Sequence, residues 1–363
     1  MKLFLSGDVM TGRGIDQILP HPGDPALHED YVRSARDYVA IAEKASGAIP
    51  EKVSWRYVWG DALAEIERRD PDARIINLET AITARGTPEP KGINYRMHPG
   101  NTGCITAAGI DCCVLANNHL GDWGLQGMID TLATLKAVGV AAAGAGRDSA
   151  LAAQPAILDT SGGRILVFGF GAPSSGVPRS WAALPDRPGV NLLPDFDDAA
   201  FRRISEDIHA WRRPGDAVVA SIHWGPNWGY DIPDEHRRFA HALIDEAGVD
   251  IVHGHSSHHP MAIEVHAGRP VLYGCGDLIN DYEGIGGHEA FRPNLTLAWF
   301  VDYDRAARRL RGLEMVPFRL RKFRLERLRG EGARWLADTL DRQCRRFGHR
   351  VGLTGAETLA LIL

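Results

Sequence analysis

The sequence has little that would tie it to a membrane. None of its apolar runs approaches the roughly 20 residues that a helix needs to cross a bilayer. The chain opens directly into an apparent strand, Lys2 to Leu5, and has no basic region followed by a long apolar stretch. We therefore expect no signal peptide, no membrane contact and a cytoplasmic location.

Cysteine is also sparse. The chain has only five: Cys104, Cys112, Cys113, Cys275 and Cys344. Their spacing fits neither a zinc knuckle nor a redox pair. An odd count suits a reducing compartment, in which buried cysteines behave as small apolar residues.

The chain has no large excess of charge of one sign. Its 41 Lys and Arg stand against 46 Asp and Glu, for a formal net charge of -5, which gives no reason to expect nucleic-acid binding. One stretch, Arg305 to Arg329, is rich in arginine. We interpret it as an edge strand with a solvated basic face, although its apolar alternation changes phase at Lys322.

What the sequence does have is the pattern of an α/β protein. Of its 363 residues, 44% are hydrophobic, which is typical of a globular chain. Short apolar runs alternate with helical patterns, and no fixed-period repeat is present. The predicted helices lie near 58–69, 125–137, 197–211, 235–246 and 332–346. Two proline-rich segments, 19–51 and 172–194, are predicted to be loops that either shape a pocket or simply cross the surface.

The ends of the apolar runs carry the chemistry. Successive runs stop at residues that can bind a metal: Asp8, then Asn77 and Glu79, then Asn117, Asn118 and His119, then His223, then His253, His255 and His258, and last Asp277. Ligands of open α/β sheets bind beyond the carboxyl ends of the strands. Carboxylate, amide and imidazole groups together suit manganese, iron or zinc. Two such ions would need a bridging carboxylate, which Asp8 or Glu79 could supply.

Each of these residues alone has an ordinary explanation. Asp8 could cap a helix, the two asparagines could form a turn, His223 could be a core histidine, and Glu79 could pair with an arginine. Burying unpaired carboxylates and imidazoles is costly, however, and unrelated caps would not recur at successive strand ends. Together the residues favour one shared metal site.

The order of the motifs resembles that of the CapA, or poly-γ-glutamate capsule-synthesis, family of the calcineurin-like metallophosphoesterase superfamily. The resemblance covers about residues 1 to 300. It rests on five segments: GDVM from Gly7, NLET from Asn77, ANNH from Ala116, HWG from His223 and GHSSHHP from Gly254. The NNH segment followed by Asp122 and Gly124 is a specific signal.

The resemblance implies an α/β fold, a calcineurin-like four-layer sandwich of two mixed β-sheets flanked by helices. It implies a domain over residues 1–300, with residues 301–363 adding a C-terminal strand and helices to the same domain. It also implies two divalent metal ions, with ligands among Asp8, Glu79, Asn118, His223 and His255. His119 matches the histidine that helps to bind or protonate substrate.

Two positions depart from the phosphoesterase pattern. Met10 stands where the first motif has a histidine, and Ser257 stands where the last motif has its second histidine. Either His253 or His258 could fill the gap in the ligand set.

Four further residues are candidates for contact with substrate or for proton transfer. His288 lies in a glycine-rich loop and could deliver an acid or base, or could be an ordinary solvated residue. Arg13 could bind a carboxylate or phosphate with two hydrogen bonds, or could form a surface ion pair. Trp224 could line a substrate pocket or belong to the core. Asn117 is a candidate substrate contact beside Asn118.

These features predict a metal-dependent enzyme that acts on a peptide or glutamyl-polymer substrate through carbonyl chemistry, with His119 and either His258 or His288 moving protons. Hydrolysis and metal-assisted epimerisation at a Cα both stay open. Phosphoester hydrolysis is a further alternative. A binding protein that keeps the metals only for structure is the non-enzymatic alternative. The sequence indicates neither the metal nor the oligomeric state.

Overall fold

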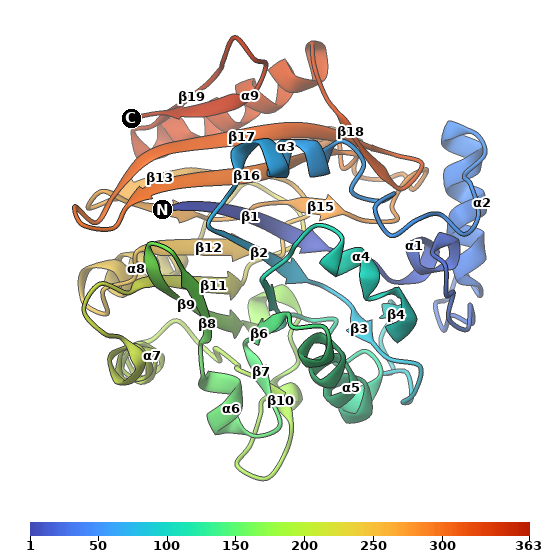
Figure 1. Ribbon diagram of the computed structural model, residues 1–363, viewed down its shortest axis with the longest axis horizontal. Helices are drawn as coiled ribbons and strands as arrows, with labels where there is room; N and C mark the ends of the chain where they lie inside the picture. Colours follow the sequence, from blue (N-terminus) through green and yellow to red (C-terminus); the bar gives the residue numbers. More distant parts are fainter.

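A computed structural model describes all 363 residues. The framework of the fold is two mixed β-sheets (Figure 1). The first sheet has the order β19 (Arg350–Leu353), β20 (Leu359–Ile362), β17 (Arg309–Arg321), β16 (Leu295–Asp304), β1 (Lys2–Val9), β2 (Ala73–Leu78), β5 (Cys112–Val114), β6 (Ala141–Ala143). In addition, β15 (Asp277–Ile279) pairs with β1, and β18 (Arg324–Arg327) pairs with β17.

The second sheet has the order β13 (Ile263–His266), β14 (Arg269–Leu272), β12 (Ile251–His255), β11 (Ala217–His223), β9 (Gly163–Gly171), β8 (Ala156–Thr160). Two small pairs complete the strands: β3 (Ala81–Ile82) with β4 (Arg96–Met97), and β7 (Ala145–Gly146) with β10 (Gly189–Val190). Strands β1, β2 and β5 are parallel to one another, as are β9, β11, β12 and β14.

Alternating side chains on the strands divide the core into three layers. Leu3 and Leu5 of β1 belong to a buried cluster that also holds Val167 and Val219 of the second sheet, so this cluster fills the space between the sheets. Phe4 points the other way, into a cluster shared with helices of the outer face. This alternation follows from the two-residue period of a strand.

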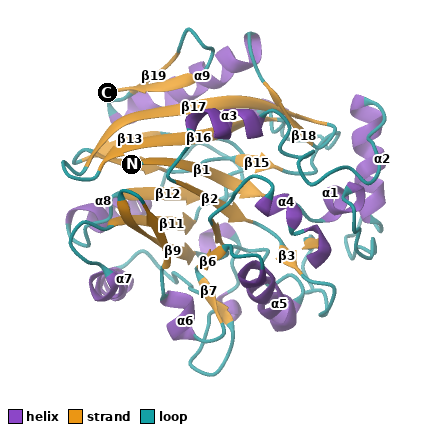
Figure 2. Cartoon of the chain, viewed as in Figure 1, coloured by secondary structure: helices purple, strands orange, loops and turns teal.

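Helices cover both outer faces (Figure 2). The first sheet is flanked by α1 (Arg13–Ile18), α2 (Ala35–Ser46), α3 (Ala62–Arg69), α4 (Gly103–Thr106) and α5 (Gly124–Ala137). The second is flanked by α7 (Asp198–Trp211) and α8 (Asp234–Asp245), whose buried residues join Phe168 and Phe170 in the third cluster. The predicted four-layer α/β sandwich is therefore confirmed.

Two helices remain. The short α6 (Ser149–Ala153) packs on β7, and α9 (Glu331–Cys344) packs on β13 and β19. Residues beyond 300 thus contribute β17 to β20 to the first sheet and one helix beside it. No helix in the structure has the length and apolar character required to cross a membrane.

Two local predictions differ from the structure. The predicted loop 19–51 contains helix α2, which begins after the cap Ser34 and buries Ala35, Tyr38 and Ala42 at helical spacing. Pro20, Pro22 and Pro25, which indicated a loop, precede this helix. The arginine-rich segment is a hairpin, because Lys322 and Phe323 both have φ of 56° and connect β17 to β18 as a two-residue turn. That turn explains the change of phase at Lys322.

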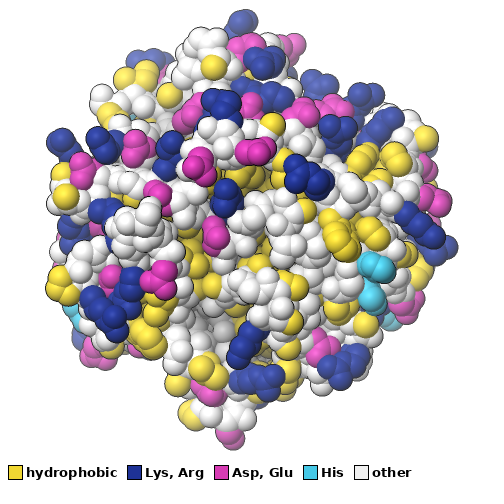
Figure 3. Space-filling view, viewed as in Figure 1, with side chains coloured by type: hydrophobic (Ala, Val, Ile, Leu, Met, Phe, Trp, Pro, Cys, Tyr) yellow, Lys and Arg dark blue, Asp and Glu magenta, His cyan; other side chains and the backbone are white.

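The surface carries mixed charge. On the face shown in Figure 3, basic and acidic side chains are interspersed, and no broad region of this face is basic alone. This distribution agrees with the small net charge of -5.

Candidate metal centre

The parallel strands bring the candidate ligands to one end of the two sheets. Asp8 lies near the carboxyl end of β1, and His223 and His255 are the last residues of β11 and β12. The register of the second sheet pairs His223 directly with His255. In Figure 1 the arrows of β1, β11 and β12 point toward the same side of the molecule.

Asp8 is fully buried and lies between two groups of possible ligands. One group is Asp8, His223 and His255, and the other is Asp8, His258 and Asp277, with all ligand atoms of a group within 4.8 Å of one another. Asp8 Oδ1 accepts a hydrogen bond of 2.8 Å from Asn77, whereas the buried Oδ2 has no partner. Asp8 is therefore positioned to contribute to two sites at once.

The backbone around Asp8 is held close to β15. Asp8 N donates to Gly276 O at 3.0 Å, and Asp8 pairs with Asp277 in the strand register. A Cβ at Gly7 would lie 1.9 Å from Gly276 O, so only glycine permits this approach. The two carboxylates are brought together by the pairing of β1 with β15.

The first histidine pair presents two nitrogens to each other. Nδ1 of His223 and Nδ1 of His255 lie 2.8 Å apart. Their outer nitrogens are fixed by oxygen atoms: His255 Nε2 lies 3.0 Å from Ser221 Oγ, and His223 Nε2 lies 2.9 Å from Asn118 Oδ1. Burial lowers the pKa of both imidazoles well below the usual value, so both rings are neutral, as metal ligands must be.

The second group is held by a chain of hydrogen bonds. His258 Nδ1 lies 2.8 Å from Asp277 Oδ1, and Asn280 donates to Asp277 Oδ2 at 2.8 Å. Burial acts to lower the pKa of His258, but the charge and hydrogen bond of Asp277 together with the charge of Asp8 raise that pKa above its ordinary value. This hydrogen bond from Asn280 orients the Asp277 carboxylate, as hydrogen-bond partners of metal ligands do.

Negative charge gathers here with little compensation. Asp8, Glu79 and Asp277 are each at most 2% exposed. Burial, and then the charge of Asp277, raises the pKa of Asp8 to about 7. Burial and the charge of Asp8 raise the pKa of Glu79 well above its ordinary value, and Lys91 opposes this only in part. Buried carboxylates in this arrangement fit a bound cation.

His119 stands beside the carboxylates with its ring oriented by a neighbour. Its Nδ1 donates to Asp122 Oδ2 at 2.6 Å, and its Nε2 lies 3.7 Å from Glu79 Oε1. Lys91 forms an ion pair of 2.7 Å with Asp122 and contacts the backbone oxygen of Asn118. Burial lowers the pKa of His119 to about 4. The Nε2 edge is thus the one directed at the site.

The two histidines that could complete the last motif lie in different surroundings. Both nitrogens of His253 are occupied, with Nδ1 3.0 Å from Ser221 Oγ and Nε2 donating to Ser6 O at 2.9 Å. His258 joins the ligand group with Asp8 and Asp277 instead. His253 therefore lies outside the groups that could hold a metal, whereas His258, predicted either to carry protons or to fill the gap in the ligand set, belongs to one of them.

Three predicted substrate contacts lie away from open space. The Asn117 side chain donates to Asn77 Oδ1 and Leu78 O, and its oxygen accepts from the backbone of His119 and Leu120, so it shapes the loop. Trp224 is 3% exposed, stacks on His236 in the outer core and donates to Tyr273 O. The structure does not bring either side chain to a ligand surface.

Arg13 is the third. It is 3% exposed and forms ion pairs with Glu29 at 3.0 Å and Asp281 at 2.5 Å, rather than the surface pair considered above. Its guanidinium lies 3.9 Å from the Tyr38 ring centre and 4.3 Å from that of Tyr95. Arg13 therefore braces the segment that follows β15, which begins with Asn280, while Asp277 is the first residue of β15 itself.

His288 lies in an exposed loop over an aromatic residue. Its ring stacks on Trp228 with a centroid distance of 3.9 Å, and Trp228 in turn lies 5.3 Å from the ring of His258. The ring of Trp228 therefore lies between His288 and the candidate ligand His258.

Sequence reasoning named Asn77 and Asp277 only as residues that can bind a metal, without placing them in the ligand set, and it assigned no role to Asn280 or Lys91. Asp277 was visible as the end of an apolar run, after Gly276. Lys91 lies in a segment without strand or helix, and only the fold brings it to His119. No local pattern marks such a residue.

Comparison with known proteins identifies the family. The family described as "Bacterial capsule synthesis protein PGA_cap" matches residues 2–282. The chain is 50% identical over 358 residues to a "Probable polyglutamine synthesis accessory protein" of Mycobacterium tuberculosis, covering 97% of this chain and 93% of that protein. It is 34% identical over 278 residues to the "PGA biosynthesis protein CapA" of Bacillus subtilis, covering 76% of this chain and 62% of that protein. The chain therefore belongs to the PGA_cap (CapA) family, as its motifs indicated.

Proposed function

We propose that this member of the PGA_cap family is a dinuclear metal-dependent enzyme that acts on carbonyl groups of a peptide or poly-γ-glutamate-like chain. The observation that carries the proposal is the unpartnered, buried Oδ2 of Asp8, placed between two groups of imidazole and carboxylate ligands. Burying a carboxylate oxygen without a hydrogen bond costs free energy. Two cations, one on each side of Asp8, would offset that cost.

The residues present fit two ions. Asp8, His223 and His255 would hold one, and Asp8, His258 and Asp277 the other, with Glu79 and Asn118 close by as further oxygen donors. The mixture of imidazole and carboxylate suits manganese, iron or zinc. When bound, such ions polarise a carbonyl and lower the pKa of a coordinated water.

Proton transfer falls to His119 in this proposal. Because Asp122 accepts the hydrogen bond from Nδ1, Nε2 is free to exchange a proton with substrate beside Glu79. Lys91 holds Asp122 in place through its ion pair. This arrangement of an oriented imidazole next to a buried carboxylate cluster supports acid–base chemistry better than a purely structural site.

The relatives' names support the substrate class. One is named for polyglutamine synthesis and another for PGA biosynthesis, and the latter matches three quarters of this chain. A glutamyl chain offers repeated amide carbonyls, and both hydrolysis and epimerisation begin with polarisation of such a group.

The first experiment is elemental analysis of the purified protein beside His223→Ala. Near two equivalents of manganese, iron or zinc in wild type, with less in the variant, support the centre. Absence of bound metal, with no binding when any of the three is added, would overturn the proposal and leave a binding protein.

The second experiment follows the metal-loaded protein with γ-linked glutamate oligomers in D₂O by mass spectrometry. Shorter products indicate hydrolysis, and deuterium at Cα without cleavage indicates epimerisation. His119→Gln should suppress either reaction while retaining metal. Activity only on phosphoesters would replace the proposal with a phosphoesterase.

A further inference from the structure

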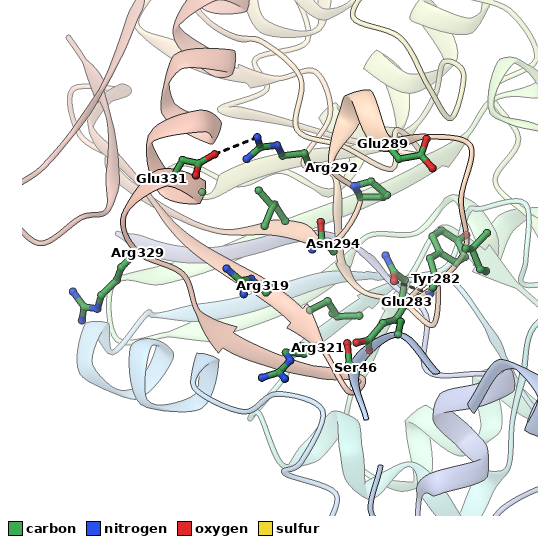
Figure 4. A pocket seen from close by; sticks show the side chains of 18 residues that line it. Ser46, Tyr282, Glu283, Glu289, Arg292, Asn294, Arg319, Arg321, Arg329 and Glu331 are labelled. Carbon is green, nitrogen blue, oxygen red and sulfur yellow. Dashed lines mark hydrogen bonds and ion pairs between the residues drawn. The ribbon is translucent and has the colours of Figure 1, made fainter. Parts of the chain in front are cut away.

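A large cavity lies beside the candidate metal centre. It has a volume of about 670 Å³ and is bounded by the loop 280–295, the end of β17, the first turn of α9 and the end of α2. Figure 4 shows Arg319 and Arg321 projecting from β17, with Tyr282 and Glu283 across from them. Its volume is within the range typical of small-ligand sites.

The cavity adjoins the centre through two residues of its lining. Asn280 donates to the candidate ligand Asp277, and its own oxygen accepts from Tyr282 N at 3.0 Å. The Tyr282 ring lies 5.4 Å from the ring of His258. One wall of the cavity is therefore in direct contact with the candidate ligands Asp277 and His258.

The lining is basic although the protein as a whole is acidic. Four arginines and three glutamates face the cavity. Arg292 is paired with Glu331 at 3.5 Å, and Arg329 lies 3.6 Å from Glu357 outside the cavity. Glu283 and Glu289 already accept hydrogen bonds from backbone N–H groups, of Phe323 and Gly287.

Arg319 and Arg321 are different, because their side chains form no hydrogen bond or ion pair within the protein. They are two residues apart on one strand, and both are exposed, so they share a face. Guanidinium groups bind carboxylates with two parallel hydrogen bonds. Two unpaired guanidinium groups on one wall suit a ligand with repeated carboxylates.

The first turn of α9 adds to the same wall. Glu331 and Gly332 line the cavity, and the helix, 14 residues long, begins at Gly330 without a side-chain cap. Uncapped N–H groups at a helix start favour anions. The start of α9 and the two arginines therefore both favour a negatively charged ligand.

We propose that this cavity is a binding subsite for the carboxylate side groups of a glutamyl chain, held by Arg319 and Arg321, while a neighbouring residue of that chain lies at the metal centre. The identity of the chain rests on the proposed function. The subsite itself rests on the cavity and its unpaired arginines.

Calorimetric titration of the purified protein with a γ-linked glutamate pentamer tests the subsite directly. The variant Arg319→Gln/Arg321→Gln should bind the pentamer on the order of tenfold more weakly or worse, since two charge-assisted contacts are lost. The matched control, Arg309→Gln/Arg311→Gln, removes the same charge from exposed positions of the same strand outside the cavity, and should bind as wild type does.

Two further arms separate this inference from the proposed function. In the Asp8→Asn background, which removes the shared metal ligand, Arg319→Gln/Arg321→Gln should still weaken pentamer binding by a similar factor, so a failed activity assay leaves the subsite standing. The neutral glutamine pentamer should bind wild type more weakly than the glutamate pentamer. Equal binding of the pentamer to wild type and Arg319→Gln/Arg321→Gln, or no binding to wild type at all, would overturn the subsite.

Discussion

The residues that could bind a metal gather in two clusters of this protein, and the clusters differ in the hydrogen bonds that their donor atoms already make. The cluster around Asp8 is buried, and Asp8 Oδ2 has no partner. The other, on β13 and α8, consists of His241, Glu264 and His266 and is partly exposed.

In the exposed cluster, the protein itself already satisfies the donors. Glu264 accepts hydrogen bonds from Tyr273 at 2.6 Å and from His241 at 3.1 Å, and it lies 3.3 Å from the guanidinium of Arg237. His266 pairs with Asp245 at 2.8 Å. A nearby arginine opposes a cation. Residue types alone therefore do not define a metal site, and unused donor atoms decide between the two clusters.

Among the tests that compare the two clusters, replacement of Asp8 should cause the largest loss of bound metal. Asp8→Asn removes a charge shared by both ligand groups, so we expect metal affinity to fall by more than the roughly 100-fold caused by loss of an outer-shell partner. Elemental analysis after gel filtration measures this loss. Glu264→Gln is the matched control and should retain the metal content of wild type. Full metal retention by Asp8→Asn would contradict the assignment.

The next test separates the two histidines that the sequence left as alternatives. His258→Ala should lose one of two metal equivalents, because His258 belongs to only one ligand group. His253→Ala should keep both ions but unfold more easily, by about 1–3 kcal/mol, since Ser6 O and Ser221 lose a buried partner. Metal analysis paired with urea unfolding gives both readouts. The reverse pattern would assign His253 as the ligand.

A smaller effect, on the pH dependence of stability, is expected at His236. Like Asp8 it has a buried atom without a partner, Nε2, but it lies among aromatic rings with no second ligand. Burial lowers its pKa to about 4. The unfolded chain, with a pKa near 6.5, binds the proton first, so the stability due to the neutral ring is present above about pH 6.5 and is lost as the pH falls toward 4.

His236→Phe keeps the stacking on Trp224 and removes this titration. The stability of wild type relative to the variant should fall by up to roughly 3 kcal/mol between pH 7 and pH 4. Denaturant unfolding at a series of pH values measures it. A pH-independent difference would show that the ring is not buried in neutral form.

The smallest effect should come from the exposed cluster. His241→Ala/His266→Ala breaks two partly exposed ion pairs, so the unfolding free energy should change by less than about 1 kcal/mol. Bound metal should be unchanged, as judged by elemental analysis. Loss of an equivalent of metal would show that this cluster, too, holds an ion.

Much of the centre could be predicted from the sequence, because strand ends in an α/β fold have a local signature. An apolar run followed at once by Asp8, by His223 or by His255 marks both the strand and the functional group at its end. The sandwich followed from the same runs together with the family resemblance, and helix boundaries followed from periodicity within a few residues.

The tertiary structure alone decided which side chains are free. The sequence offers His253 and His258 as equivalent candidate ligands. Only the tertiary packing gives both nitrogens of His253 a partner, with Ser6 of β1 at Nε2 and Ser221 of β11 at Nδ1. The sequence left Arg13 as a candidate substrate contact. In the fold its guanidinium is paired with Glu29 and Asp281, which are 16 and 268 residues away along the chain. The sequence by itself determines the residue types, and its short-range periodicity indicates where the strands lie. Whether a donor atom is free depends on partners from distant segments of the chain, and no local pattern encodes those partners.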